Sequence, residues 1–314
     1  MMRRMVSRRC SCFLALGLST SLTAALYSAV LSQQSASRRT HVVMLGTGTP
    51  RPLPHRFGPS TAVVVDGTPY LVDFGPGVVR RAAAAAEKGI EGLAVNRLET
   101  AFVTHLHSDH TVGYPDLIFT PWVMGRTRLR VYGPKGIAEM TEHVLAAWKV
   151  DIDIRTSGEG ARQRVDVEAH EIEAGLVYQD ANVTVTAFPA RHGDVPNAFG
   201  YAIKTPDRTI VISGDTSPNP ALVAACQRCD ILIHEAYASD VAAPMTNWAE
   251  YRARHHTSTR ELAEIASKSQ PRLLVVYHIP ERSQTGTIPP EQYLREIQAI
   301  YKGPVVIARD LDVY

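Results

Sequence analysis

Three imidazoles and a carboxylate stand close together in the segment 104–110, which reads Thr-His-Leu-His-Ser-Asp-His. The four candidate ligands in it are His105, His107, Asp109 and His110. Four donors this close in sequence would crowd one tetrahedral ion, whereas two ions about 3.5–4 Å apart could share them and complete their coordination from distant residues. A solvated surface loop explains a lone histidine better than it explains this spacing. The segment therefore predicts a dinuclear metal site and further donors elsewhere in the chain.

Several predicted strands end at side chains that can bind a metal or move a proton. The apolar, β-branched run at 101–104 predicts a buried strand, which places 105–110 on the loop and first helical turn beyond it. Further strands are predicted at 70–73, 182–189, 208–213, 231–233 and 273–277, and they lead to Asp73, His192, Asp215, His234-Glu235 and His278 respectively. His192 or His278 alone would more often be a core histidine. The repetition at successive strand ends favours one shared site.

The rest of the chain, 314 residues of which 45% are apolar, suits one large α/β domain or two small ones. Strands are also predicted at 41–48, 61–66, 129–132 and 199–204, and helices at 78–88, 135–148 and from Arg260, where 257–259 supplies the N-cap. The strands 61–66 and 70–73 form a hairpin about Gly67.

The motif H-x-H-x-D-H after a buried strand resembles the signature of the metallo-β-lactamase fold superfamily of dinuclear hydrolases. The resemblance implies an α/β fold of four layers, an αββα sandwich with two sheets face to face between helices. It also implies two Zn²⁺ ions, with Mn²⁺ or Fe²⁺ left open. Two such ions would lower the pKa of a shared water enough to provide a hydroxide nucleophile near neutral pH. No G-x-S-x-G elbow offers a serine nucleophile instead.

The resemblance assigns the ligands residue by residue. One ion would be held by His105, His107 and His192, the other by Asp109, His110 and His278, with Asp215 bridging the two. Asp73 would hold one of the ligand histidines and would not itself touch a metal.

Two short motifs, His234-Glu235-Ala236 and His256-Thr257-Ser258, resemble the branch that contains tRNase Z and the type III arylsulfatases. In that branch the residue matching His256 protonates the leaving oxygen, and the one matching Glu235 orients it. The predicted catalytic residues are therefore His256, Glu235 and Asp109.

The N-terminus differs from the rest of the chain. Four arginines precede the mostly apolar stretch 13–31, so residues 1–37 are predicted to be a signal peptide or an uncleaved anchor, and 38–314 the hydrolase domain. This predicts an exported protein that is periplasmic, secreted or tethered by its N-terminus. Cys226 and Cys229 could form a disulfide there or could be two small buried side chains, and the sequence leaves both readings open.

The charge of the chain argues against an RNA substrate. Without the four arginines of residues 1–37, the 33 basic residues become 29, against 31 acidic ones. A near-neutral body argues against a nucleic-acid partner. Where the tRNase Z enzymes carry a basic arm, the segment 151–180 holds eight acidic residues and three arginines, and the first loop, 49–60, lacks their Lys and Arg-Asn. An RNA enzyme would also be out of place beyond the membrane.

The leading hypothesis is therefore an exported dinuclear zinc hydrolase of small anionic esters, such as an aryl sulfate, a phosphodiester or a phosphonate ester. Membrane contact is expected only through an uncleaved N-terminal segment, and a homodimer is left open. The alternatives are a tRNA 3′-processing endoribonuclease, a lactonase or thioesterase of the same fold, and a binding module that has lost its metals.

Overall fold

The computed structural model describes residues 40–158, 163–239, 246–283 and 286–314. The chain divides into two units, 1–38 and 39–314, and all described elements belong to the second. The predicted N-terminal segment, 1–37, lies outside the described residues. Across the described helices, none combines the length and the apolar character needed to cross a bilayer.

The first sheet has six strands in the order β1-β2-β3-β4-β5-β6. The pairs β1–β2 and β2–β3 are antiparallel, and the remaining pairs are parallel. Its strands are β1 (Thr40–Gly46), β2 (Ser60–Val65), β3 (Thr68–Val72), β4 (Thr100–Phe102), β5 (Leu129–Gly133) and β6 (Val167–Glu171).

The second sheet has seven strands in the order β15-β12-β11-β10-β9-β8-β7. The strands from β15 to β10 are parallel, and those from β10 to β7 pair antiparallel. They are β7 (Gly175–Gln179), β8 (Thr184–Pro189), β9 (Phe199–Lys204), β10 (Thr209–Ile212), β11 (Ile231–Glu235), β12 (Leu273–Tyr277) and β15 (Val305–Ile307). A separate two-stranded ribbon pairs β13 (Arg282–Ser283) with β14 (Gly286–Thr287).

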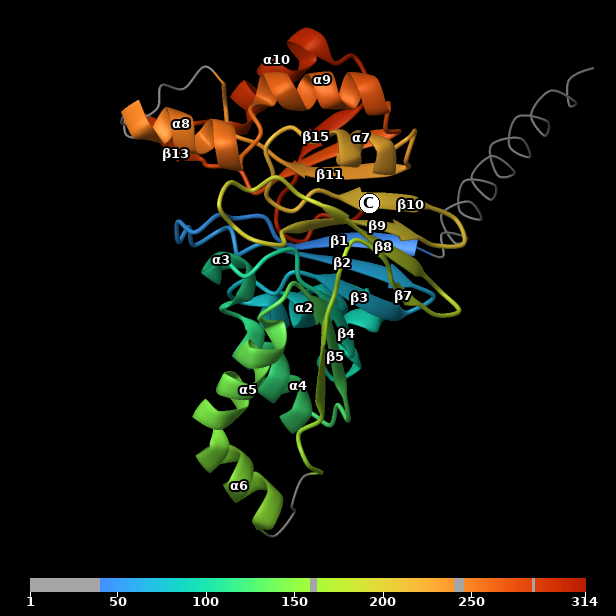
Figure 1. Cartoon of the computed structure of the whole chain (residues 1–314). Coiled ribbons are helices and arrows are strands. Elements are labelled where there is room, and N and C mark those ends of the chain that lie inside the picture. Colours follow the sequence, from blue (N-terminus) through green and yellow to red (C-terminus); the bar gives the residue numbers. More distant parts are fainter. Residues whose placement is uncertain (1–39, 159–162, 240–245, 284–285) are drawn as a thin grey trace, which may run out of the picture. The chain divides into compact units, whose positions relative to one another are not determined.

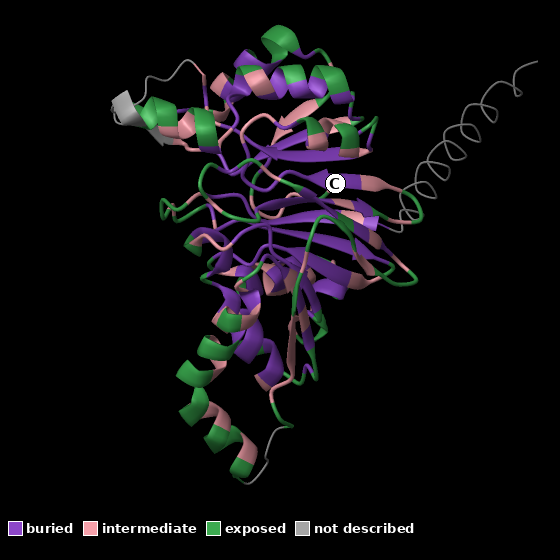
Figure 2. Ribbon diagram, viewed as in Figure 1, coloured by how far each residue is buried: buried purple, intermediate pink, exposed green. Residues whose placement is uncertain are grey.

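Three apolar cores separate four layers (Figures 1 and 2). The central core joins the inner faces of the two sheets, and it includes Val63 and Phe102 from the first sheet and Tyr201 and Val275 from the second. The outer face of the first sheet packs against the helices α2 (Val78–Glu87), α4 (Tyr114–Val123) and α5 (Ile137–Ala147). The outer face of the second packs against α7 (Pro220–Ala225), α9 (Thr259–Ser269) and α10 (Pro290–Ile300). This confirms the predicted αββα sandwich.

The direction of the strands explains why polar side chains gather at one edge. The parallel strands β3, β4 and β5 end on the same side of the first sheet, as do β10, β11 and β12 in the second. Two antiparallel steps separate β8 from β10, so β8 runs the same way as β10. Backbone bonds from Phe199 N to Thr104 O, 2.9 Å, and from His278 N to Thr47 O, 3.0 Å, join the two sheets at this edge.

Some elements differ from the sequence prediction. β4 ends at Phe102, shortly before the predicted end at 104: the amide of Val103 still donates to Tyr132 O of β5, but that of Thr104 leaves the sheet and donates to the Asp73 carboxylate. β11 runs on through Glu235. No element was predicted over α8 (Thr246–His255), which the structure adds.

The segment after α5 forms α6 (Lys149–Ser157), a helix with no buried residue that Figure 1 shows far from the sheets. In the second half of the chain, α7 ends at Ala225 and the two cysteines follow it. Cys226 and Cys229 are buried and joined by a disulfide, which is the first of the two readings that the sequence left open.

Candidate metal centre

All seven predicted ligands converge where the strand ends meet. Their nitrogen and oxygen atoms form overlapping groups, in each of which every donor atom lies within 4.8 Å of the others. The groups are His105-His107-His192, His105-His110-Asp215, Asp109-His110-His278 and His192-Asp215-His256. The first and third are the two sets of three that the resemblance implied. Binding of metal by these residues stays a prediction, and the geometry suits it.

Several of the donor atoms lie at hydrogen-bond distance from one another. Nε2 of His105 and Nε2 of His192 lie 3.0 Å and 3.2 Å from Nδ1 of His107. Nε2 of His278 lies 3.2 Å from a carboxylate oxygen of Asp109. Nitrogens of three imidazoles directed at one point are an arrangement that a cation stabilises.

Two buried atoms at the centre of the cluster have no hydrogen-bond partner among the described residues. They are Nε2 of His110 and Oδ1 of Asp215, which lie 3.5 Å apart. The other oxygen of Asp215 lies 3.6 Å from Nε2 of His278 and 3.9 Å from Nε2 of His192, so the carboxylate faces both groups of histidines. Buried polar atoms without partners are costly in a folded protein. Divalent cations at this point would satisfy both.

Burial acts to lower the pKa of each ligand histidine, but at His110 and His278 the neighbouring aspartates outweigh burial and raise the pKa. Burial lowers the pKa of His105 well below its usual value and the pKa of His192 to about 4, although Asp215 opposes the shift in both. Burial by itself would raise the pKa of Asp215, but the positive charges of His278 and His110 lower it well below its usual range. Neutral imidazoles and an ionised carboxylate are the forms that bind metals.

Other residues orient the ligands. The Asp73 carboxylate accepts hydrogen bonds from Thr104 N at 2.8 Å and from Nδ1 of His110 at 2.9 Å, so His110 presents Nε2 to the cluster. Nδ1 of His192 donates to His255 O at 2.7 Å and likewise leaves Nε2 for a metal. Such partners fix the tautomer and the direction of a ligand histidine.

His256 lies at the rim of the cluster, with 20% of its side chain exposed. Its Nδ1 donates to Oε1 of Glu235 at 3.1 Å, and that buried oxygen also accepts from the backbone amides of Thr216 and Thr257. Nδ1 is also the His256 nitrogen that faces Asp215, at 4.0 Å. Nδ1 lies in a group of donors with His192 and Asp215, but its hydrogen bond to Glu235 favours a role other than metal binding. Nε2 remains as the nitrogen that can meet a substrate.

The charge at His256 follows from these neighbours. Burial lowers its pKa, but the charge and hydrogen bond of Glu235, together with Asp215 and Asp109, outweigh burial and raise the pKa to about 9. Cations bound at Asp215 and Asp109 would cancel much of the effect of these two carboxylates on the pKa of His256. Glu235 would then be the main cause of the raised pKa. The ring can therefore carry a proton at neutral pH.

The first loop offers less charge to a substrate than its sequence suggests. Arg56 is buried, and its Nε lies 2.5 Å from Glu281, which also contacts His55 at 2.6 Å. Arg51 is exposed and lines a hollow of about 350 Å³ that reaches Asp109. Of the three side chains in this loop that could be cationic, Arg51, His55 and Arg56, Arg51 is therefore the one available for an anionic substrate.

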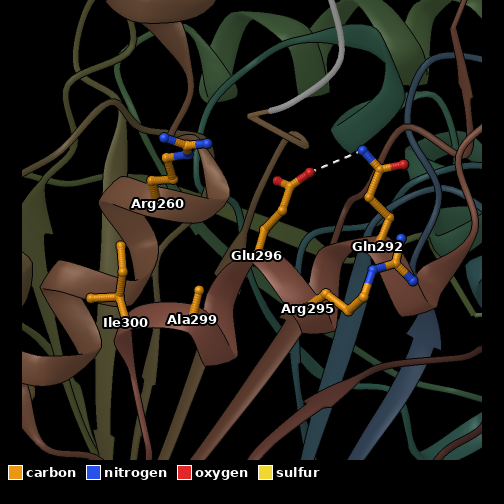
Figure 3. A pocket seen from close by; sticks show the side chains of 6 residues that line it. All are labelled: Arg260, Gln292, Arg295, Glu296, Ala299 and Ile300. Carbon is orange, nitrogen blue, oxygen red and sulfur yellow. Dashed lines mark hydrogen bonds between the residues drawn. The ribbon is translucent and has the colours of Figure 1, made fainter.

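A second hollow, of about 420 Å³, lies over α9 and α10 (Figure 3). Its polar residues include Arg260, Arg295 and Gln292, whose Nε2 donates to Oε1 of Glu296 at 2.9 Å. Glu296 also accepts from the backbone amide of Ser239 at 2.7 Å. No predicted ligand lines this hollow, and its buried carboxylate is already bonded, so it has no evident part in the chemistry.

Comparison with known proteins places the chain in a family. Residues 68–279 match the family model described as the β-lactamase superfamily domain. A protein named ribonuclease Z from Mycobacterium sp. (strain KMS) is 37% identical over 243 residues, 76% of this chain and 83% of that protein. Ribonuclease Z of Mycobacterium bovis (strain BCG / Pasteur 1173P2) is 31% identical over 280 residues, 86% of this chain and 96% of its own length.

Solved structures show the same fold. The short form of human tRNase Z has a TM-score of 0.65 and 22% identity, covering 87% of this chain and 98% of its own. The metallo-β-lactamase fold protein YhfI from Bacillus subtilis has a TM-score of 0.68 and 17% identity, and the match covers 88% of this chain and 98% of YhfI.

These relatives correct three expectations. The leading hypothesis of an exported hydrolase of small esters is wrong, because the relatives are named for a ribonuclease, which was the alternative. The exclusion of nucleic acid is wrong for the same reason, since the net charge of a whole chain does not describe the field at one site. The predicted export, which was made from residues 1–37 and then used against an RNA substrate, is wrong as well, because it does not suit a chain whose relatives are named for a ribonuclease.

The sequence, the structure and the comparisons agree on a hydrolase of the metallo-β-lactamase fold. Its cluster of histidines and aspartates is suited to divalent metal. The chain belongs to the β-lactamase superfamily, and the relatives described above carry the name ribonuclease Z.

Proposed function

We propose that the chain is a metal-dependent endoribonuclease that cleaves a phosphodiester bond in precursor tRNA, as the name of its relatives suggests. The observation that carries the proposal is the pair of His256 and Glu235, 3.1 Å apart beside the cluster of ligands, in a chain 37% identical to a ribonuclease Z. Both residues belong to the motifs that pointed to this branch in the sequence.

The residues present suit two zinc ions. The donor set is imidazole and carboxylate, which zinc accepts, and the carboxylate of Asp215 faces both groups of histidines. When bound, such a pair supplies positive charge to the phosphoryl oxygens and lowers the pKa of a water molecule. The protein holds His110 and His192 in the required tautomer through Asp73 and the His255 carbonyl.

His256 supplies the proton for the leaving oxygen. As a water oxygen bonds to phosphorus and the P–O bond to the ribose breaks, the leaving oxygen of the ribose takes the proton from Nε2 of His256, while Nδ1 stays bonded to Glu235. The Glu235 carboxylate stabilises the charged ring before the transfer, and its two backbone bonds, from Thr216 and Thr257, keep it in place. An alkoxide is a poor leaving group, so this proton matters more for RNA than for an activated ester.

Cleavage of a precursor tRNA by the metal-loaded full-length protein tests the proposal. We expect a cut near the 3′ end of the tRNA body, abolished by chelation and restored by zinc. Bis-p-nitrophenyl phosphate assayed alongside reports whether the metal centre is active. Hydrolysis of the small diester without any cleavage of precursor tRNA would refute the proposed substrate while leaving the metal chemistry in place.

The pH dependence of the reaction should report on Glu235. Replacing it by glutamine removes a negative charge that raises the pKa of His256 to about 9, so the pKa falls. Since the acid must be protonated, the rate of the variant should decline at lower pH than the wild-type rate as pH rises. The pH profile of kcat/KM on precursor tRNA measures the shift.

Glu296→Gln is the matched control for this experiment, because Glu296 is also buried and hydrogen-bonded but lies in the second hollow, which no predicted ligand lines (Figure 3). Metal content is measured at each pH. If kcat/KM declines at the same alkaline pH in Glu235→Gln as in the wild type, Glu235 does not control the pKa of His256.

A further inference from the structure

Three rings on α8 form a continuous stack that leads to the metal centre. Trp248 and Tyr251 have ring centroids 4.8 Å apart and planes 9° apart, and Tyr251 and His255 have centroids 4.0 Å and planes 16° apart. Their spacing of three and then four residues places them on one face of the helix. Trp248 is 38% exposed and His255 is 7% exposed, so the stack runs from solvent into the protein.

The inner end of the stack is fixed to a predicted metal ligand. The carbonyl of His255 accepts from Nδ1 of His192 at 2.7 Å, and the two rings meet edge to face with centroids 5.3 Å apart. A Cβ on Gly193 would lie 1.9 Å from Nε2 of His255, so only glycine allows this close contact. The backbone amide of Gly193 donates to Arg254 O at 3.1 Å. α8 is therefore built onto the turn that carries His192.

A hollow of about 420 Å³ lies beside the stack. Its lining includes Tyr251 and His255 of the stack, the predicted ligand His107 and two charged side chains, Lys135 and Asp194. Because His107 is a predicted ligand, this hollow opens directly from the metal centre. Arg254 also lies nearby, but it is paired with Asp194 at 2.6 Å. Lys135 has no such ion pair among the described residues, which leaves it able to meet a phosphate.

Packing within α8 does not explain the outer end of the stack. Both faces of Tyr251 are covered, by Trp248 and by His255, and His255 packs on Gly193, so these rings have structural partners. Trp248 covers Tyr251 with one face of its indole and keeps more than a third of its surface in solvent. An exposed indole at the end of a rigid stack is a surface on which a further flat ring can stack.

We propose that α8 is a stacking platform for single-stranded RNA next to the scissile phosphate, with one base stacked on Trp248 and the connecting backbone passing Lys135. The inference rests on the proposed function and adds the place where the strand beside the cleaved bond is held. From Trp248 to His255 the helix rises about 10 Å, the length of about three stacked nucleotides. Stacking is tolerant of sequence because every base has an aromatic face.

Binding of a single-stranded decamer of adenylate to the zinc-loaded full-length protein tests the platform. Loss of a base–aromatic contact costs about 1–3 kcal/mol, which corresponds to about a 5- to 150-fold rise in Kd. We expect a rise in this range for Trp248→Ala and a smaller one for Trp248→Phe, because phenylalanine still offers a ring. KM for precursor tRNA should rise in the same order.

Trp148→Ala is the matched control. Trp148 is 41% exposed and stacks on Phe119 at 5.4 Å, but it follows α5 on the outer side of the first sheet, away from the cluster. An equal loss of affinity in Trp148→Ala and Trp248→Ala would overturn the inference, because it would indicate a general effect of losing an exposed tryptophan.

Two further measurements separate stacking from damage to the fold. A stacked base quenches tryptophan emission, so the quenching on RNA binding should be present in wild type and Trp148→Phe and lost in Trp248→Phe. Lys135→Ala should lower the salt slope of log K by about 0.7, the share of one phosphate contact on a single strand. If the wild type cleaves precursor tRNA, and Trp248→Ala binds the decamer and cleaves precursor tRNA as well as the wild type, the proposed platform is wrong and the proposed function stands. If the wild type cleaves no precursor tRNA, the proposed function itself fails.

Discussion

Asp215→Ala is expected to release both metal ions together and to abolish hydrolysis of RNA. The carboxylate lies between the two groups of histidines, 3.5 Å from Nε2 of His110, 3.6 Å from that of His278 and 3.9 Å from that of His192. A shared negative charge lets two cations approach, so its loss weakens both positions. Activity should fall by more than the about 10²–10³-fold that removal of one electrostatic contact to a transition state costs.

Elemental analysis of purified protein measures this directly, with about two ions per chain expected for wild type and fewer than one for the variant. Asp215→Asn keeps the size of the side chain and should show the same loss, because an amide does not carry the charge. Asp180→Asn is the matched control, since Asp180 also accepts several hydrogen bonds, from Tyr70 and Asn182 among others, but lies at the turn where β8 begins. Retention of both ions and of activity in Asp215→Ala would show that another residue bridges them.

The resemblance carried by the H-x-H-x-D-H motif predicted the fold, and local patterns predicted the strands whose ends carry the ligands. Each strand end that carries a ligand follows an apolar run with clear borders, as at 273–277, where the predicted strand and β12 coincide. Parallel strands bring their ends to one edge of a sheet, but His105 and His278 follow strands of different sheets, and it was the resemblance that grouped them. The capping box of Ser258 and Glu261 likewise fixed the start of α9.

Features that depend on tertiary contacts could not be predicted from the sequence. α8 lacks a clear apolar stripe, and its aromatic residues look like surface positions until the stack on His192 is seen. The signal for it was the spacing of Trp248, Tyr251 and His255. The substrate was misjudged because the count of charges was taken over the whole chain, whereas binding of a strand at one hollow depends on the few side chains that line it.

His256→Ala is expected to lower cleavage of precursor tRNA by about 10²–10⁴-fold, the usual value of a general acid, and to keep both ions. The loss should be much smaller on bis-p-nitrophenyl phosphate, because p-nitrophenolate is a stable anion that hardly needs a proton, whereas the ribose alkoxide does. The comparison of the two substrates isolates proton transfer, since a fault in metal binding or in folding would reduce both rates alike.

The same comparison decides between the roles that the geometry leaves for His256. His256 belongs to one of the groups of donors, with His192 and Asp215, so loss of metal in the alanine variant would make it a ligand. Equal losses on both substrates with metal retained would make it a residue that positions the substrate or supports the turn before α9. His170→Ala serves as the control histidine, because His170 is exposed on β6, stacks on Tyr132 at 4.7 Å and belongs to none of the groups of candidate ligands. If His256 donates the proton, the loss of activity in His256→Ala should grow with the basicity of the leaving oxygen, and His170→Ala should show no such trend. Only a proton donor produces this result, because the effect of losing a metal ligand or a structural residue does not depend on the leaving group.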